Sequence, residues 1–151
     1  MSTKQKAEDI ALDIFARMQQ ITVANGAETD IGLKVFRGKR KVDDDEAPCC
    51  VLVEGPDTPV DRPGKLPTST ITQTYILVGY LACDADNPND AAHKIIRDFK
   101  RAIFKGDGTL GGAVIRANYR GRDIGPRADG VNIVTALIEI TIDYVEDLTN
   151  P

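Results

Sequence analysis

Val134 to Tyr144 read VTALIEITIDY, and apolar residues occupy every second position of this stretch. Successive side chains of a β-strand point to opposite faces of a sheet, so one face of this segment is apolar and the other is largely polar. Such alternation is typical of an antiparallel sheet that is buried on one side. The stretch therefore predicts a long strand near the centre of the fold, and the other elements can be placed around it.

Two segments have the period of a helix and several more have that of a strand. Apolar residues recur every three or four positions in 7–24 and in 89–105, and basic residues gather near the end of the second segment. Strands are predicted at 31–35, 49–53, 70–83, 113–119 and 131–145. Helices and strands do not alternate regularly. We therefore expect an α+β fold, a mostly antiparallel sheet of about four to five strands with two helices packed on one face.

The length of 151 residues suits a single domain, 1–151, with three exposed loops. The first, at about 37–47, joins a basic block to an acidic block and is too polar to pack. The second, at about 54–70, contains Pro56, Pro59, Pro63 and Pro67, which neither a helix nor a central strand accepts. The third, at about 119–130, is rich in arginine and glycine.

Composition and charge exclude several classes of protein. Apolar residues make up 42% of the chain and charged residues 28%, which predicts a folded protein. The net charge of −4 and the isoelectric point near 5.0 give no overall attraction to nucleic acid or to an acidic membrane surface. No apolar stretch is long enough to cross a bilayer, so we expect a soluble protein.

The residues that usually carry catalysis occur in unsuitable patterns. His93 is the single histidine, and no partner at a fixed spacing stands near it. Gly106 to Gly111 match G-x-G-x-x-G, but a predicted helix precedes them where a phosphate-binding loop needs a strand, which favours a simple turn. Cys49 and Cys50 lie in an apolar run and are expected in the core. We expect no enzyme activity, no cofactor and no metal.

Charged residues on two loops are the strongest candidates for a site. The arginines are Arg116, Arg120, Arg122 and Arg127, and the acidic residues are Asp43, Asp44, Asp45 and Glu46. Guanidinium groups suit phosphates and carboxylates equally well. Tyr119 is the only aromatic residue near the arginines, so a platform for stacking bases is disfavoured. The pattern favours a subunit interface in which the basic loop meets an acidic one.

The order of elements resembles that of the tail terminator, or tail completion, proteins of long-tailed bacteriophages. The likeness is carried by five parts of the chain: the opening helix 7–24, a strand pair whose hairpin tip is 37–46, the long strand 70–83, the helix 89–105, and the closing strand 131–145 after Arg127-Ala128-Asp129-Gly130. It covers nearly the whole chain. This family is recognised by element order and size, so no functional residue is carried over by position.

The resemblance implies a ring, commonly a hexamer, that caps the tail tube, stops its polymerisation and joins it to the head. The implied partners are further copies of the chain, the tail tube protein and the head connector protein, with DNA only as passing cargo and no membrane. The implied location is the virion tail or neck, after assembly in the host cytoplasm. The alternatives are another head–tail connector or tail tube component, or a nucleic-acid-binding module that uses the 116–127 turn and Arg37 to Lys41. A small hydrolase comes third.

Overall fold

A computed structural model describes residues 6–38, 41–60, 68–125, 132–149 and 151. These residues form two α-helices and one five-stranded sheet with the strand order β1-β2-β3-β5-β4. The elements are α1 (Lys6–Gln19), β1 (Val35–Arg37), β2 (Cys49–Val60), β3 (Thr68–Ala82), α2 (Pro88–Phe104), β4 (Arg116–Ile124) and β5 (Ile133–Asp147). All neighbouring strands are antiparallel except β1 and β2. The expected α+β class is confirmed.

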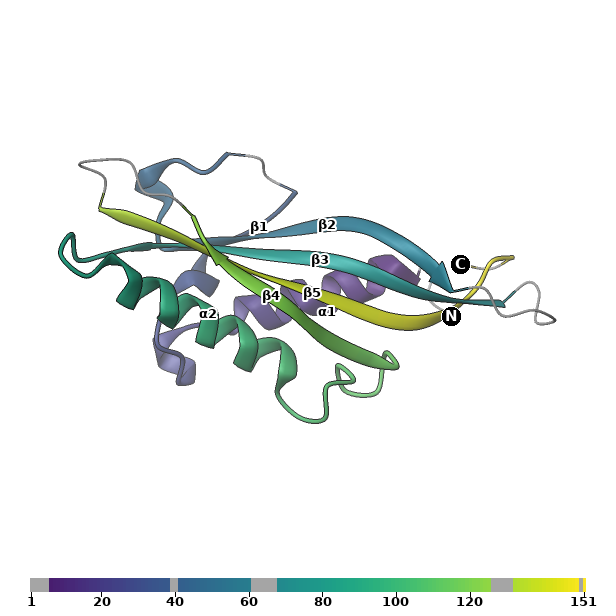
Figure 1. Ribbon diagram of the computed structural model, residues 1–151. Coiled ribbons are helices and arrows are strands. Elements are labelled where there is room, and N and C mark those ends of the chain that lie inside the picture. The colour runs from purple at the N-terminus through teal and green to yellow at the C-terminus, as the bar shows by residue number, and fades with distance from the viewer. Residues whose placement is uncertain (1–5, 39–40, 61–67, 126–131, 150) are drawn as a thin grey trace.

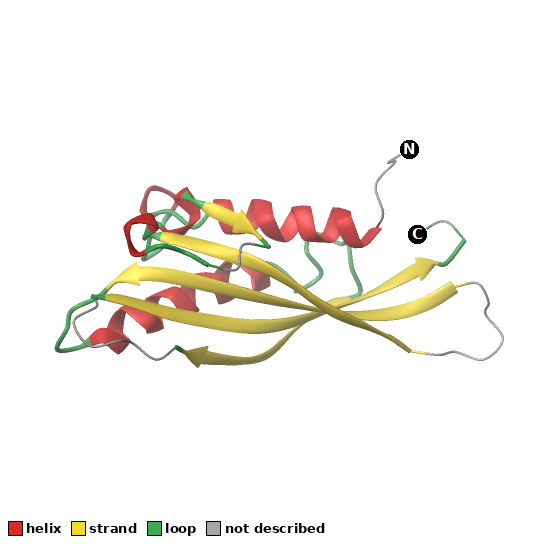
Figure 2. Ribbon diagram, turned by 90° about the horizontal axis from the view of Figure 1, so that it is seen from above, coloured by secondary structure: helices red, strands yellow, loops and turns green. Residues whose placement is uncertain are grey.

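β5 lies between β3 and β4, at the position that its alternating sequence predicts. Both helices pack against one face of the sheet, the helix face (Figures 1 and 2). From β5 the helix face carries Val134, Ala136, Ile138, Ile140, Ile142 and Tyr144, all buried. The opposite face of the sheet has no α-helix among the described residues, and we call it the open face.

Glycine allows close packing at two points of the core. A Cβ atom at Gly79 of β3 would lie 2.5 Å from Cγ2 of Ile95, so glycine lets α2 approach the sheet. A Cβ atom at Gly32 would lie 2.4 Å from the carbonyl oxygen of Met18, at the end of α1. The first contact packs α2 on the sheet, and the second packs the 3₁₀ turn Ile31–Leu33 on the end of α1.

The prediction for the first strand is wrong in most of its length. Ile31–Leu33 form a 3₁₀ turn, and β1 begins only at Val35. β1 is parallel to β2, so the segment between them is a crossover connection and not a hairpin tip. The alternation of Ile31, Leu33 and Val35 misled because it covers too few residues to separate a strand from a turn with one buried side. Of the expected loop at 37–47, Arg37 belongs to β1, and residues 39–40 lie outside the described residues.

The expected loop at 54–70 is also wrong. β2 continues to Val60 and β3 begins at Thr68, while residues 61–67 lie outside the described part. Pro56 falls where the register shifts between Glu54 and Asp57. β1 pairs only with Cys50–Leu52, so the outer side of β2 beyond that point is a sheet edge. Proline is accepted at bulges and edges, because no ladder hydrogen bond needs its missing N–H there.

The third expected loop, 119–130, is a strand over its first part. β4 runs to Ile124 and pairs with β5, with a register shift between Tyr119 and Gly121. Gly121 has a φ of 140°, which a residue with a side chain rarely adopts. A glycine at a bulge therefore continues the strand through a sequence that was predicted to be a turn. Residues 126–131, including Arg127, lie outside the described residues.

The first prediction concerns Tyr75, whose side chain is buried on the helix face. Its hydroxyl has no hydrogen-bond partner among the described residues, and burial raises the pKa of Tyr75. A buried hydroxyl that makes no hydrogen bond is destabilising, so Tyr75→Phe should unfold at the same temperature or higher, with a gain of up to about 1 kcal/mol. Thermal denaturation measures this. A loss of more than about 1 kcal/mol would show that the hydroxyl is bonded in solution.

Candidate subunit interface

The arginines of β4 are divided between the two faces of the sheet. Arg116 stands opposite Asp143 of β5, on the open face. Arg120 is also on the open face, where its Nε donates a hydrogen bond to Thr141 Oγ1 at 3.0 Å. Arg122 stands opposite the buried Ile138 and lies on the helix face. The arginines that were expected on one loop therefore lie on a strand at the edge of the sheet. They place basic groups on both faces of that strand.

A polar network supports the arginines of the open face. Asp143 accepts hydrogen bonds from Thr72 Oγ1 at 2.7 Å and from Asn118 Nδ2 at 3.0 Å. Asn118 Nδ2 also lies 3.3 Å from Thr141 Oγ1, the atom that Arg120 contacts. The network links β3, β5 and β4, so the first half of β4, around Asn118 and Arg120, is held to the rest of the sheet.

On the helix face, β4 contacts α2 through two basic residues. Nη1 of Arg122 lies 3.3 Å from Nδ1 of His93, the single histidine of the sequence. The Nζ atom of Lys100 lies 4.4 Å from the centre of the Tyr119 ring, a cation–π contact. Tyr119 thus contacts a cation of its own chain and is still 39% exposed.

None of the three β4 arginines has a carboxylate within salt-bridge distance among the described residues. Each of the other arginines that the structure describes has a carboxylate within this distance. Those pairs are Arg17–Asp13 at 3.3 Å, Arg37–Glu54 at 3.2 Å, Arg97–Glu28 at 2.7 Å and Arg101–Glu28 at 3.9 Å. The hydrogen bond from Arg97 lowers the pKa of Glu28 and keeps this pair ionised. Unpaired guanidinium groups on an exposed strand are available to an anionic partner.

The structure does not bring the acidic segment to these arginines. Asp44–Glu46 form a 3₁₀ turn just before β2, while β1 and β4 are the opposite edges of the sheet. The backbone N–H of Asp43 donates to Glu46 Oε2 at 3.0 Å, which closes the turn on itself. Asp45 is exposed, and the side chain of Asp44 is outside the described part. Any contact between the acidic segment and β4 would have to join two subunits.

Other residues considered for chemistry have structural roles. Cys49 and Cys50 are buried, as expected, and burial raises the pKa of Cys50, which opposes formation of a reactive thiolate. Gly106 to Gly111 form turns after α2, and the carbonyl of Gly108 accepts a hydrogen bond from the Ala117 N–H at 2.7 Å. Within the described residues, no three His, Cys, Asp or Glu side chains gather in a group that could hold a metal ion.

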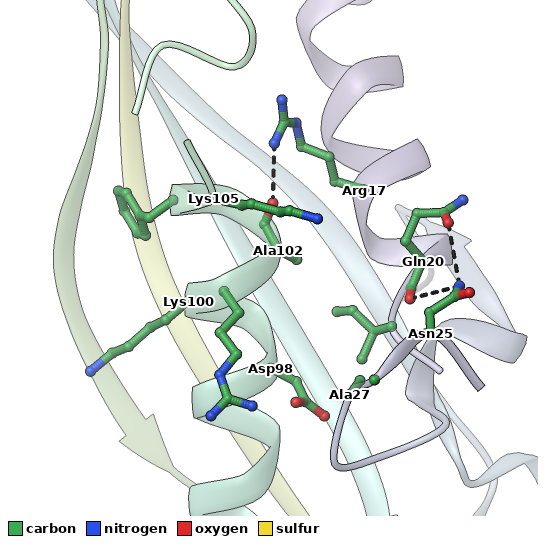
Figure 3. Close-up of a pocket in the computed structure, with 12 residues that line it drawn as sticks. Arg17, Gln20, Asn25, Ala27, Asp98, Lys100, Ala102 and Lys105 are labelled. Carbon is green, nitrogen blue, oxygen red and sulfur yellow. Dashed lines mark hydrogen bonds between the residues drawn. The ribbon is translucent and has the colours of Figure 1, made fainter. Parts of the chain in front are cut away.

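A basic groove between the helices was not predicted from the sequence. It has a volume of about 910 Å³ and lies between the C-terminal halves of α1 and α2 and the segment 25–27 (Figure 3). Its lining includes Arg17, Ile21, Ala27, Ala102, Phe104 and Lys105. The basic end of α2 was visible in the sequence. The groove itself arises only when α1 packs on α2, where Arg17 Nη1 donates to the carbonyl of Ala102 at 3.2 Å.

Comparisons with known proteins assign no family to the chain. No family model matches the chain, and no curated protein shows significant similarity to it. Among the residues that the structure describes, no helix has the length and apolar character needed to span a membrane.

Proposed function

We propose that the chain is a structural protein of phage assembly, a tail terminator that forms a ring. In this proposal the ring, commonly a hexamer in the family that the sequence resembles, caps the tail tube, stops its polymerisation and joins it to the head connector. The observation that supports the proposal best is that Arg116, Arg120 and Arg122, on an exposed edge strand, have no carboxylate partner among the residues that the structure describes. The role requires binding surfaces and no reaction, so we propose no enzymatic activity.

The form of the two sheet edges indicates how subunits would meet. The edge at β4 carries a bulge and charged side chains, and the edge at β2 carries Pro56, Pro59 and a register shift. Bulges, prolines and charges prevent one sheet edge from pairing with another. Contacts between subunits would therefore be made by side chains. A head-to-tail contact between two different surfaces closes into a ring when its rotation allows it.

A nucleic-acid-binding module is the second candidate, because unpaired guanidinium groups also suit phosphates. Two observations make it the weaker one. The net charge of −4 opposes general attraction to nucleic acid, and the ring of Tyr119 already contacts Lys100 of its own chain. A carboxylate-bearing surface of another subunit fits both observations. The acidic residues 43–46 are the partners that the sequence predicts for the β4 arginines. In this proposal, residues 43–46 of one subunit contact β4 of another subunit.

The test removes the two open-face arginines together. Arg116→Ala with Arg120→Ala should give a folded protein that no longer forms rings, because losing a paired interfacial guanidinium costs about 2 kcal/mol or more and leaves its carboxylate unmatched. That cost corresponds to roughly a 30-fold weaker contact for each arginine. Sedimentation velocity over a range of concentrations measures the effect, and Lys94→Ala, an exposed cation on α2, is the control.

The same variants separate the two candidates. Under the proposal, the double variant loses rings, and the wild-type protein shows no strong affinity for DNA at physiological salt. If the double variant forms rings like the wild type while a salt-dependent DNA affinity collapses, the nucleic-acid function replaces the proposed one.

A further inference from the structure

The groove between α1 and α2 combines an apolar floor with basic residues at its mouth. Ile21, Ala27 and Ala102 contribute apolar surface. Lys105 points toward α1 in Figure 3 and has no ion-pair or hydrogen-bond partner for its side chain among the described residues. The Arg101 side chain is 63% exposed and reaches Glu28 only at 3.9 Å. Such a groove suits a short segment that carries an apolar side chain beside carboxylates.

The chain itself contains a segment of this kind. β2, β3 and β5 extend beyond the helices as an arm (Figures 1 and 2), and Val60, Thr70 and Val145 form one row across it. Val60 is 46% exposed and Val145 is 39% exposed. β5 ends at Asp147 and is followed by a turn at Leu148 and Thr149, in which Leu148 is 53% exposed. We call the strand end and this turn together, Val145–Thr149, the C-terminal turn. Val60 and Val145 thus lie exposed in one row of the arm, and Leu148 is exposed in the turn that follows β5.

The C-terminal turn is acidic and held in shape. Asp147 Oδ1 accepts hydrogen bonds from the backbone N–H of Thr149 at 3.0 Å and from its Oγ1 at 2.7 Å. This local bonding fixes the turn around Leu148. Glu146 and Asp147 precede the leucine, so the turn combines one apolar side chain with two carboxylates. A preformed turn loses little conformational freedom on binding.

A subunit cannot place this turn in its own groove. Lys6 Nζ donates to the carbonyl of Val145 at 2.8 Å, which holds the start of the turn near the first residue of α1. The groove lies at the other end of α1, around Arg17 and Ile21. α1 has 14 residues and is about 21 Å long at a rise of ~1.5 Å per residue. The turn and the groove are therefore two separate surfaces of one subunit.

We propose that the C-terminal turn of one subunit docks in the basic groove of the next. Leu148 enters the apolar floor and Glu146 faces Lys105 and Arg101, while Asp147, on the other face of β5, keeps its hydrogen bonds to Thr149 and holds the turn. The contact joins two different surfaces, which is the type of contact that builds a ring. It is also continuous with β4, because Lys100 lines the groove and covers Tyr119. This docking rests on the ring function proposed above and names one of its contacts.

Matched variants test the docking in the full-length protein. Leu148→Asp should raise the concentration needed for rings by at least tenfold, and Lys105→Glu should do the same. The controls are Leu33→Asp, at a leucine that is 67% exposed and does not line the groove, and Lys94→Glu on the same helix as the groove. Both controls should assemble like the wild type. Mixing the Leu148→Asp and Lys105→Glu proteins restores one intact contact per pair, so dimers should form without rings.

A peptide tests the same contact without assembly. A synthetic peptide with the sequence of residues 143–151 should bind the Leu148→Asp protein, whose groove is intact, and should not bind protein that carries Lys105→Glu as well. Rings of Leu148→Asp at the wild-type concentration, or a peptide that binds both proteins equally, overturn the docking and leave the proposed function standing. A wild-type protein that stays monomeric at all concentrations overturns the ring function instead, while the peptide result still decides whether the groove accepts the turn.

Discussion

Ile140→Asp is expected to leave the chain unfolded. Ile140 is fully buried on the helix face of β5, between Tyr75 of β3 and Tyr119 of β4 in the register of the sheet. A carboxylate there would lose its hydration without gaining a cationic partner, at a cost of several kcal/mol. A domain of this kind has a total stability of about 5–15 kcal/mol, so one such change can remove most of it. Circular dichroism and thermal denaturation measure the loss.

Glu139 provides the control for that variant. It is the preceding residue of β5 and is exposed on the open face. Glu139→Gln should therefore unfold close to the wild-type temperature, because surface substitutions away from special features have small effects. A folded Ile140→Asp protein with a cooperative transition near that of Glu139→Gln would contradict the placement of β5 at the centre of the core.

The second large effect is expected for Asp98→Ala. Asp98 is a buried carboxylate of α2 that accepts hydrogen bonds from the backbone N–H groups of Glu28 and Thr29, at 3.0 Å and 2.8 Å, and from Thr29 Oγ1 at 2.7 Å. Alanine would leave these donors unsatisfied beside the helix, at a cost on the order of 3 kcal/mol. The melting temperature should fall by roughly 6–12 °C for a domain of this size.

Asp98 also bears on the groove, because it holds the segment that follows the groove wall at Ala27. The control is Asp90→Ala, at an exposed acidic residue in the first turn of α2, where a loss below about 1 kcal/mol is expected from the helix dipole alone. Equal melting temperatures for the Asp98→Ala and Asp90→Ala proteins would show that the Asp98 hydrogen bonds contribute nothing to stability in solution.

The sequence predicted the elements that have a long and regular apolar period. β5 and α2 were placed within a few residues of their observed ends, because each has a full apolar face to bury. β2 was cut short at Glu54, since proline normally ends a central strand. That rule did not apply because β1 covers only Cys50–Leu52 and leaves the rest of β2 at an edge.

The candidate site shows a second limit of sequence reasoning. Arg116, Arg120 and Arg122 are an even number of residues apart, so regular alternation would place all three on one face of β4. The bulge between Tyr119 and Gly121 adds one residue and moves Arg122 to the helix face. The arginines themselves were predicted as the candidate site. Their lack of carboxylate partners among the described residues was not predicted, because it depends on which carboxylates the fold brings close to β4.

The groove was missed for a related reason. Lys100, Arg101 and Lys105 could be read from the sequence as a basic helix end, but their approach to α1 depends on tertiary packing. Gly79, which lets α2 approach the sheet, and Gly32, which lets the turn at 31–33 pack on the end of α1, carry no period that would mark them in advance. Surfaces formed between elements that are distant in the chain are predictable only once the fold is known.

Sedimentation velocity of the wild-type protein over a wide concentration range, with negative-stain images of the largest species, tests the central claim most directly. The ring proposal predicts that the 16.4 kDa chain passes from monomer to one closed assembly of fixed size, with no larger species at higher concentration. The assembly should be lost when Arg116 and Arg120 are both alanine. A wild-type chain that stays monomeric throughout, or that grows into open filaments without limit, would contradict the proposal.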